Sequence, residues 1–158
     1  MQSRILNLNF LPTNTDAGLL VLRVLTGVTL YIRHGYEKMF HFTEMANGRF
    51  RPDDIWHIGV VPTLVIAMLC DSICSVLIIL GVAARWASLY SFTVIFVAWA
   101  FRHHFAFLGG AGEHGEVIMF YLAALLTLFM TGPGRFSVDA RVDQSQVGLI
   151  QPGKSYQA

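Results

Sequence analysis

The chain has 158 residues, of which 54% are hydrophobic and only 13% are charged, whereas a soluble domain carries roughly 25% charged residues. Such a chain is either buried on all sides or solvated by lipid. Its net charge of +1, without a basic stripe, argues against nucleic acid as a partner. Its two cysteines are too few for a disulfide framework.

Four apolar segments follow one another along the chain, and a span of the hydrocarbon core needs about 20 such residues. They cover approximately residues 17–34, 60–81, 86–103 and 115–131. The alternating pattern of strands is absent, and the backbone in lipid must satisfy its own hydrogen bonds. A soluble bundle would need polar residues at every third or fourth position, which these segments lack. The sequence therefore predicts an all-α integral membrane protein, a four-helix bundle.

The remaining segments flank this predicted domain of residues 17–134. Residues 1–16 form an N-terminal segment, expected to be cytoplasmic or interfacial, and residues 135–158 form a polar tail, expected to be disordered or bound along a larger partner. No cleavage site follows the first segment, so it is expected to remain in the mature protein. Four spans place both termini on one side. Lys and Arg are equally divided between the two sides, and the charge pattern of the loops favours cytoplasmic termini in an inner membrane.

Two charged residues interrupt the apolar segments. Arg23 lies in the first and Asp71 in the second, and a charge at the centre of a spanning helix costs roughly 2.5–3.5 kcal/mol on insertion scales. Counting about 1.5 Å per residue from the helix ends places both near the midplane. We therefore expect a buried Arg23–Asp71 ion pair.

All six histidines are predicted to lie on the side of the membrane opposite the termini. His34, Lys38, His103 and Glu116 fall at helix ends on that side, and imidazole and carboxylate groups can exchange protons in the physiological range. These four residues form a candidate polar cluster that could frame a quinone headgroup. The alternative is that they anchor helix ends at the interface. No metal-ligand spacing is evident, and no catalytic residue is assigned.

Three stretches resemble the DoxX family of small membrane proteins. "LRVLTGVTLYIRHGYEKMF" resembles its first-helix signature, with Arg23 followed by His34, Gly35 and Lys38. "LIILGVAARWASL" resembles its Leu-Gly-x-x-x-Arg turn, and "GPGRFSVDA" its Gly-Pro-Gly-x-x-Ser-x-Asp ending. The resemblance extends over residues 17 to 140. It departs at Asp71, where the family usually has the longer glutamate.

The resemblance implies a four-helix protein of the inner membrane. Some members of the family are small subunits of a terminal quinol oxidase or a thiosulfate:quinone oxidoreductase, and others are associated with thiol stress and membrane redox complexes. The chain is thus expected to be an accessory subunit of a larger redox or energy-converting membrane complex, in contact with lipid. Quinone is the candidate ligand, and no cofactor is firmly assigned. The alternatives are a quinone-reactive subunit, a haem-bearing anchor with two axial histidines, and a small-molecule transporter.

Overall fold

The computed structural model describes residues 14–48, 54, 56–102, 104–105 and 115–150, and the side chains of residues 144 and 146–150 are left aside. This described part is helical and contains no strand. Two of its helices contain π-helical segments, labelled η. The elements in chain order are α2 (Thr15–Leu30), η1 (Tyr31–Gly35), α3 (Tyr36–Phe40), α4 (Phe42–Ala46), α5 (Val60–Met68), η2 (Leu69–Cys74), α6 (Ser75–Leu80), α7 (Ala84–Arg102), α8 (Gly115–Thr131) and α9 (Val138–Ile150).

The first helical run is longer than the sequence predicted. It begins at Thr15 and is capped by Asn14, whose side-chain oxygen accepts a hydrogen bond from the N–H of Ala17 at 3.0 Å, a common N-cap. It then continues through α2, η1 and α3 without a break to Phe40. The predicted end at residue 34 is therefore wrong, and His34 and Lys38 lie inside the helix. No proline or left-handed glycine follows His34 to stop it.

The second helical run is bounded by glycines with positive φ. Gly59 precedes α5 with φ 105°, and Gly81 ends α6 with φ 71°, a backbone region that glycine adopts without strain. Pro62 lies in the first turn of α5, where its missing N–H costs no helical hydrogen bond. The second helical run therefore spans Val60–Leu80.

Three helical runs are long and apolar enough to cross a membrane, namely Thr15–Phe40, Val60–Leu80 and Ala84–Arg102. The next helix, α8, is also apolar but has only 17 residues. Large apolar side chains point outward, with Ile32, Trp86 and Phe120 exposed by 66%, 74% and 77%. Such an exterior suits lipid rather than water. The chain is therefore an all-α integral membrane protein, and a fourth crossing by α8 remains a prediction.

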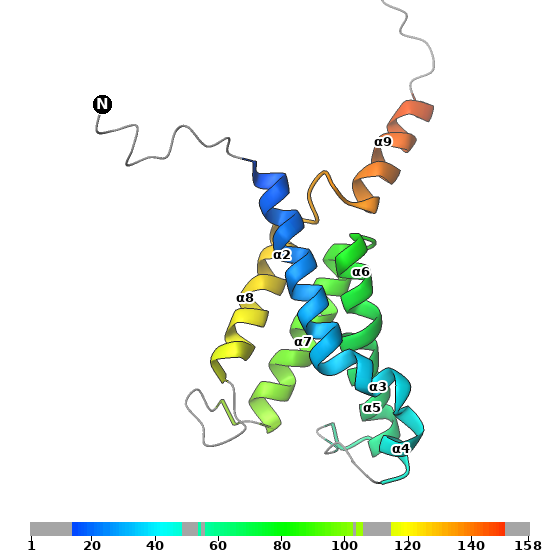
Figure 1. Ribbon diagram of the computed structural model, residues 1–158, viewed down its shortest axis with the longest axis vertical. Coiled ribbons are helices and arrows are strands. Elements are labelled where there is room, and N and C mark those ends of the chain that lie inside the picture. Colours follow the sequence, from blue (N-terminus) through cyan, green and yellow to red (C-terminus); the bar gives the residue numbers. More distant parts are fainter. Residues whose placement is uncertain (1–13, 49–53, 55, 103, 106–114, 151–158) are drawn as a thin grey trace, which may run out of the picture.

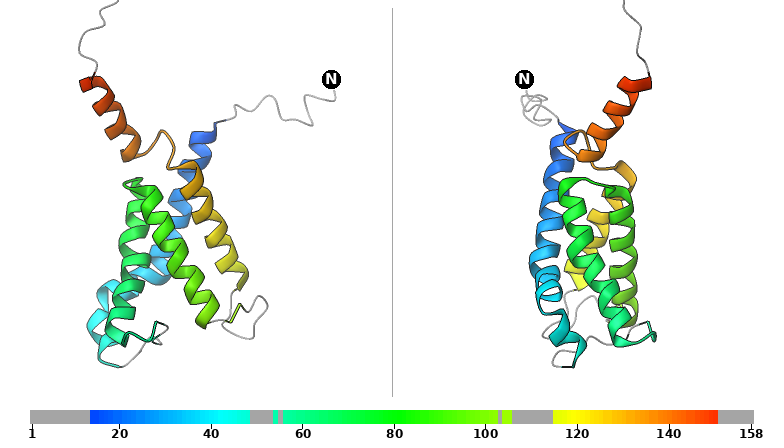
Figure 2. Two further views of the ribbon diagram at one scale, coloured as in Figure 1. Left: turned by 180° about the vertical axis from the view of Figure 1, so that it is seen from behind. Right: turned by 90° about the vertical axis from the view of Figure 1, so that its right-hand side faces the viewer.

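The apolar core lies where α6, α7 and α8 meet. Ile78, Ala87, Leu125 and Leu128 form its buried centre. From this core the helices diverge toward the end of the molecule that carries α3 and α4, as Figures 1 and 2 show. We call this end the histidine end, because His34, His41, His57 and His104 belong to the segments there. The opposite end, which holds the start of α2 and all of α9, is called the terminal end.

The tail contains a further helix that the sequence analysis did not predict. Residues 138–150 form α9, which leads away from the bundle at the terminal end (Figure 1). The expectation of a disordered tail is thus corrected over this range, and the binding of the tail along a larger partner stays a prediction. Residues 151–158 lie outside the described part of the chain. Because α9 and the start of α2 share one end of the bundle, both described extremities of the chain emerge on the same side.

Candidate functional site

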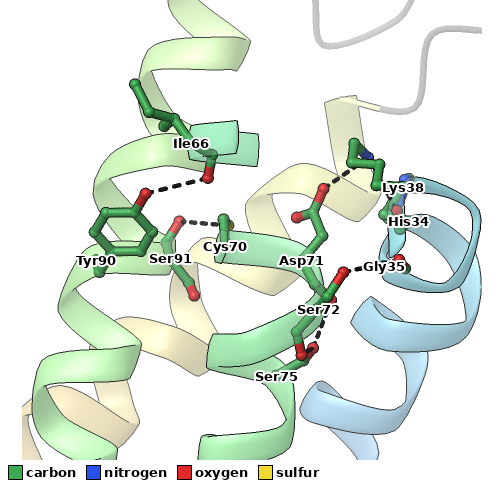
Figure 3. Close-up of polar contacts among 10 residues, drawn as sticks. All are labelled: His34, Gly35, Lys38, Ile66, Cys70, Asp71, Ser72, Ser75, Tyr90 and Ser91. Carbon is green, nitrogen blue, oxygen red and sulfur yellow. Dashed lines mark hydrogen bonds and ion pairs between the residues drawn. The ribbon is translucent and has the colours of Figure 1, made fainter. Parts of the chain in front are cut away.

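The two π-helical segments cross each other in direct backbone contact. Gly35 of η1 packs against Asp71 of η2 so closely that a Cβ atom at Gly35 would lie 2.2 Å from the Asp71 carbonyl oxygen. The hydroxyl of Ser72 donates a hydrogen bond to the Gly35 carbonyl at 2.8 Å (Figure 3). A π-helical turn changes the direction of successive side chains and is frequent at functional sites. Here one such turn in each helix builds the crossing.

An ion pair bridges this crossing. The Lys38 ammonium lies 2.8 Å from the Asp71 carboxylate and also donates to the His34 carbonyl at 3.0 Å (Figure 3). The two charged side chains are only 18% and 13% exposed. Asp71 is therefore neutralised by Lys38, one turn beyond His34. The predicted partner, Arg23, does not reach it, and the predicted Arg23–Asp71 pair is wrong.

The physical reason is the register between the two antiparallel helices. Gly27 faces the Ser75 carbonyl and the Ile79 side chain, while Gly35 faces Asp71. Position 23 consequently faces Gly81, and the Arg23 guanidinium contacts that glycine. The ten residues from Asp71 to Gly81 correspond to about 15 Å along a helix. Arg23 and Asp71 therefore lie at different depths.

Arg23 instead holds the loop that follows α8. Its guanidinium donates to the Pro133 carbonyl at 3.1 Å and to the Phe136 carbonyl, and it is attracted by the Asp139 carboxylate. Arg23 is itself only 3% exposed. A buried guanidinium needs such acceptors, because an unpaired buried charge is costly.

Asp139 completes this arrangement. Its carboxylate accepts hydrogen bonds from the N–H groups of Ala83 and Ala84, at 2.8 and 3.0 Å, where α7 begins. Its own N–H donates to the Gly81 carbonyl at 2.9 Å. We call Arg23, Gly81 and Asp139, with the Pro133 and Phe136 carbonyls, the clasp. The clasp ties α2, the α6–α7 turn and the C-terminal loop together at the terminal end.

Sequence reasoning missed a second set of polar residues, on α7. The Tyr90 hydroxyl donates to the Ile66 carbonyl at 3.1 Å, and the Cys70 thiol lies 3.9 Å from the Ser91 carbonyl (Figure 3). Ser88 and Ser91 are fully buried. Small residues at such positions allow close helix packing in lipid. The sequence does contain a pattern that predicts these buried serines. Small residues at positions 84, 87, 88 and 91 fall on one face of α7, and this is the buried face.

The structure brings together only part of the predicted polar cluster. His34 and Lys38 are one turn apart, and the His34 imidazole interacts electrostatically with Asp71. Glu116 is exposed at the start of α8, and Figures 1 and 2 place that start on the opposite side of the histidine end from α3. His103 lies outside the described residues. The cluster that the structure supports is thus His34, Lys38 and Asp71.

This remaining cluster contains donors and acceptors but no metal-binding geometry. Among the described residues, no group of three or more His, Cys, Asp or Glu side chains is placed to hold a metal ion. Cys70 and Cys74 are both free thiols. The Lys38 ammonium and the His34 imidazole could donate hydrogen bonds to a carbonyl group of a bound molecule, and Asp71 could exchange a proton with it.

A helical membrane bundle with paired charges inside its spans is the class of protein that the fold and the site define. The family model of DoxX matches residues 18–104, more than half of the chain. The chain therefore belongs to the DoxX family, as the sequence motifs suggested. No curated protein and no solved structure matched the chain.

The matched range and the residues beyond it have different roles in the structure. The range includes both π-helical segments, Lys38, Asp71 and the Gly81 turn. The "GPGRFSVDA" ending lies outside the match, yet it supplies the other half of the clasp. The three motif stretches are thus joined in space, because Arg23 and Asp139 both contact the Gly81 turn.

Proposed function

We propose that the chain is a small accessory subunit of a larger redox or energy-converting complex in the inner membrane. The observation that carries this proposal is that the charged side chains of the bundle bind other parts of the same chain. Arg23 and Asp139 join the chain's own helices and loops, and Lys38 and Asp71 join η1 to η2. Polar groups engaged in this way hold a scaffold together, which suits a subunit that supports catalytic partners.

The outer surface supports the same proposal. Large apolar side chains line the outside of all the long helices, and α9 projects away from the bundle at the terminal end. A bundle of this kind offers its flanks to transmembrane partners and α9 to a partner at the membrane surface. With cytoplasmic termini, as the loop charges favour, α9 would meet a cytoplasmic partner.

The test is affinity purification in mild detergent, with the stoichiometric partners identified by mass spectrometry and an oxidised-minus-reduced optical spectrum of the eluate. The proposal expects a redox enzyme or a cytochrome complex at a fixed ratio to the chain. An unrelated small membrane protein, tagged and expressed at the same level, is the matched control. A solitary chain or homo-oligomer in native membranes would refute the proposal.

We propose as the alternative function that the chain itself contacts a quinone. The specific observation in its favour is the Lys38–Asp71 pair beside His34, an ionisable group of residues within apolar helices. Such residues often mark a functional site in membranes. The Lys38 ammonium would donate to a quinone carbonyl, and Asp71 would serve as the proton-exchanging group.

Photolabelling distinguishes this alternative from the accessory role. An azidoquinone should label the peptide that contains Lys38 or the one that contains Asp71, and an excess of unlabelled quinone should abolish the labelling. An aryl azide with the same isoprenoid tail but no quinone carbonyls is the matched control. Labelling spread over all lipid-facing helices, without competition, would refute the quinone site and leave the accessory role intact.

A further inference from the structure

A pocket of about 290 Å³ lies at the histidine end, beside the turn between α3 and α4. Its lining residues are Tyr36, Glu37, His41, Glu44 and Met45. None of them belongs to the clasp or to the His34, Lys38 and Asp71 cluster. The pocket is thus a separate feature, and it is built by α3, α4 and the His41 turn between them, in a stretch that the sequence analysis had placed outside the helices.

The charge of the pocket is set by two carboxylates. Glu44 lies 3.3 Å from the His41 ring. The Glu37 carboxylate has no hydrogen bond or ion pair among the described residues, and it interacts electrostatically with the His34 ring. The adjacent cation, Lys38, is turned toward Asp71 instead. The residues that line the pocket thus include the Glu37 carboxylate and no lysine or arginine, and a cationic group is the natural complement of that carboxylate.

Aromatic and thioether groups form the rest of the lining. The Tyr36 ring packs against Phe40 with their centroids 4.7 Å apart, which holds the ring in place at the pocket. A cation over such a ring gains about 0.5–1 kcal/mol at an exposed site. A divalent metal ion fits less well, because the described residues hold no cluster of three metal ligands. An organic ammonium group matches both the charge and the apolar wall.

The depth of the pocket indicates where that ammonium group comes from. The run Thr15–Phe40 has 26 residues and is about 39 Å long, whereas the hydrocarbon core is about 30 Å thick. At least one end of the run therefore extends past the hydrocarbon core. We place its last turns, which carry Glu37 and Lys38, at the level of the lipid headgroups, where tyrosine is commonly found. A phospholipid headgroup has the size and the location to enter the pocket from the surrounding bilayer.

We propose that this pocket binds the ammonium group of a zwitterionic phospholipid, with Glu37 as the countercharge and Tyr36 as the cation–π face. The site would hold the protein to amine-bearing lipids on the histidine side of the membrane. This proposal is independent of the accessory function, because it requires neither a partner protein nor a quinone.

Native mass spectrometry of the full chain in detergent tests the proposal. Phosphatidylethanolamine, phosphatidylglycerol and N-acetylated phosphatidylethanolamine, all with the same acyl chains, are titrated separately. We expect phosphatidylethanolamine to bind about fivefold or more tightly than the other two. Glu37→Gln should remove that preference. Asp143→Asn, which neutralises an exposed carboxylate on α9 at the terminal end, should keep it.

Two further outcomes separate the sources of the ammonium group. Competition by soluble phosphoethanolamine would assign the preference to the headgroup alone, and a preference without such competition would assign it to the bilayer-anchored lipid. Equal binding of the three lipids would overturn the proposal. So would an unchanged preference in Glu37→Gln, provided that variant unfolds at the same temperature as the wild type.

Discussion

Replacement of Gly35 by alanine should destabilise the protein because it forces the two π-helical segments apart. A Cβ atom there would lie 2.2 Å from the Asp71 carbonyl oxygen and 2.7 Å from its carbonyl carbon. Both are backbone atoms that cannot rotate away, so the helices must separate by about 1 Å to reach ordinary contact distance. The Ser72 hydrogen bond to the Gly35 carbonyl, now 2.8 Å long, would be stretched as well.

The expected loss is about 2–4 kcal/mol of unfolding free energy. Overpacking of this kind costs about 1–3 kcal/mol, and a lost hydrogen bond adds about 1 kcal/mol. Reversible unfolding in mixed micelles of mild detergent and dodecyl sulfate, followed by far-UV circular dichroism, measures the difference.

Gly18 provides the matched control in the same helical run. A Cβ at Gly18 meets nothing within 4 Å, so Gly18→Ala should be neutral or should stabilise the helix by up to about 1 kcal/mol. If Gly35→Ala and Gly18→Ala unfold alike, η1 and η2 do not cross as closely as described here, and the reasoning fails.

Three further predictions concern charged groups. The first is tested by double-mutant cycles of unfolding free energy, in which Lys38→Met and Asp71→Asn should couple by about 0.5–3 kcal/mol. In the matched cycle, Arg23→Gln and Asp71→Asn should be additive to within about 0.5 kcal/mol. The reverse pattern would restore the pairing expected from the sequence. Asp139→Ala should lower the unfolding free energy by about 0.5–2 kcal/mol because the cap of α7 is lost. In the same unfolding assay, Asp139→Asn should lose less than Asp139→Ala. Equal stability of the wild type and both variants would contradict the clasp. Burial tends to raise the pKa of Asp54, but hydrogen bonds from Gly59, Thr63 and Ile58 outweigh it and hold the pKa below its ordinary value. A carboxylate with a lowered pKa stabilises the fold above its unfolded-state pKa, and this stabilisation is lost as the pH falls through the folded-state pKa. The wild type should therefore melt at a higher temperature than Asp54→Asn near neutral pH and lose that advantage below about pH 4. A difference in melting temperature that does not change with pH would refute this role.

The sequence by itself determined the class of the protein and the course of most of its helices. Long apolar segments with few charges can be stable only in lipid, and the backbone there must be helical. Gly81 and the Gly132-Pro133 pair are local stop signals, and α6 and α8 end directly before them. The order of the motifs also indicated the DoxX family. These features depend on neighbouring residues, and the sequence displays neighbouring residues directly.

The partners of the charged residues were decided by the tertiary structure alone. A buried arginine or aspartate can pair with any suitable group within reach, and its depth depends on where each helix begins and how two helices cross. The first helix extends to Phe40, and the close contact at Gly35 sets the register, so Lys38 meets Asp71 and Arg23 meets the C-terminal loop. Counting residues from assumed helix ends could not reveal this, because the register is set by packing between segments far apart in the chain.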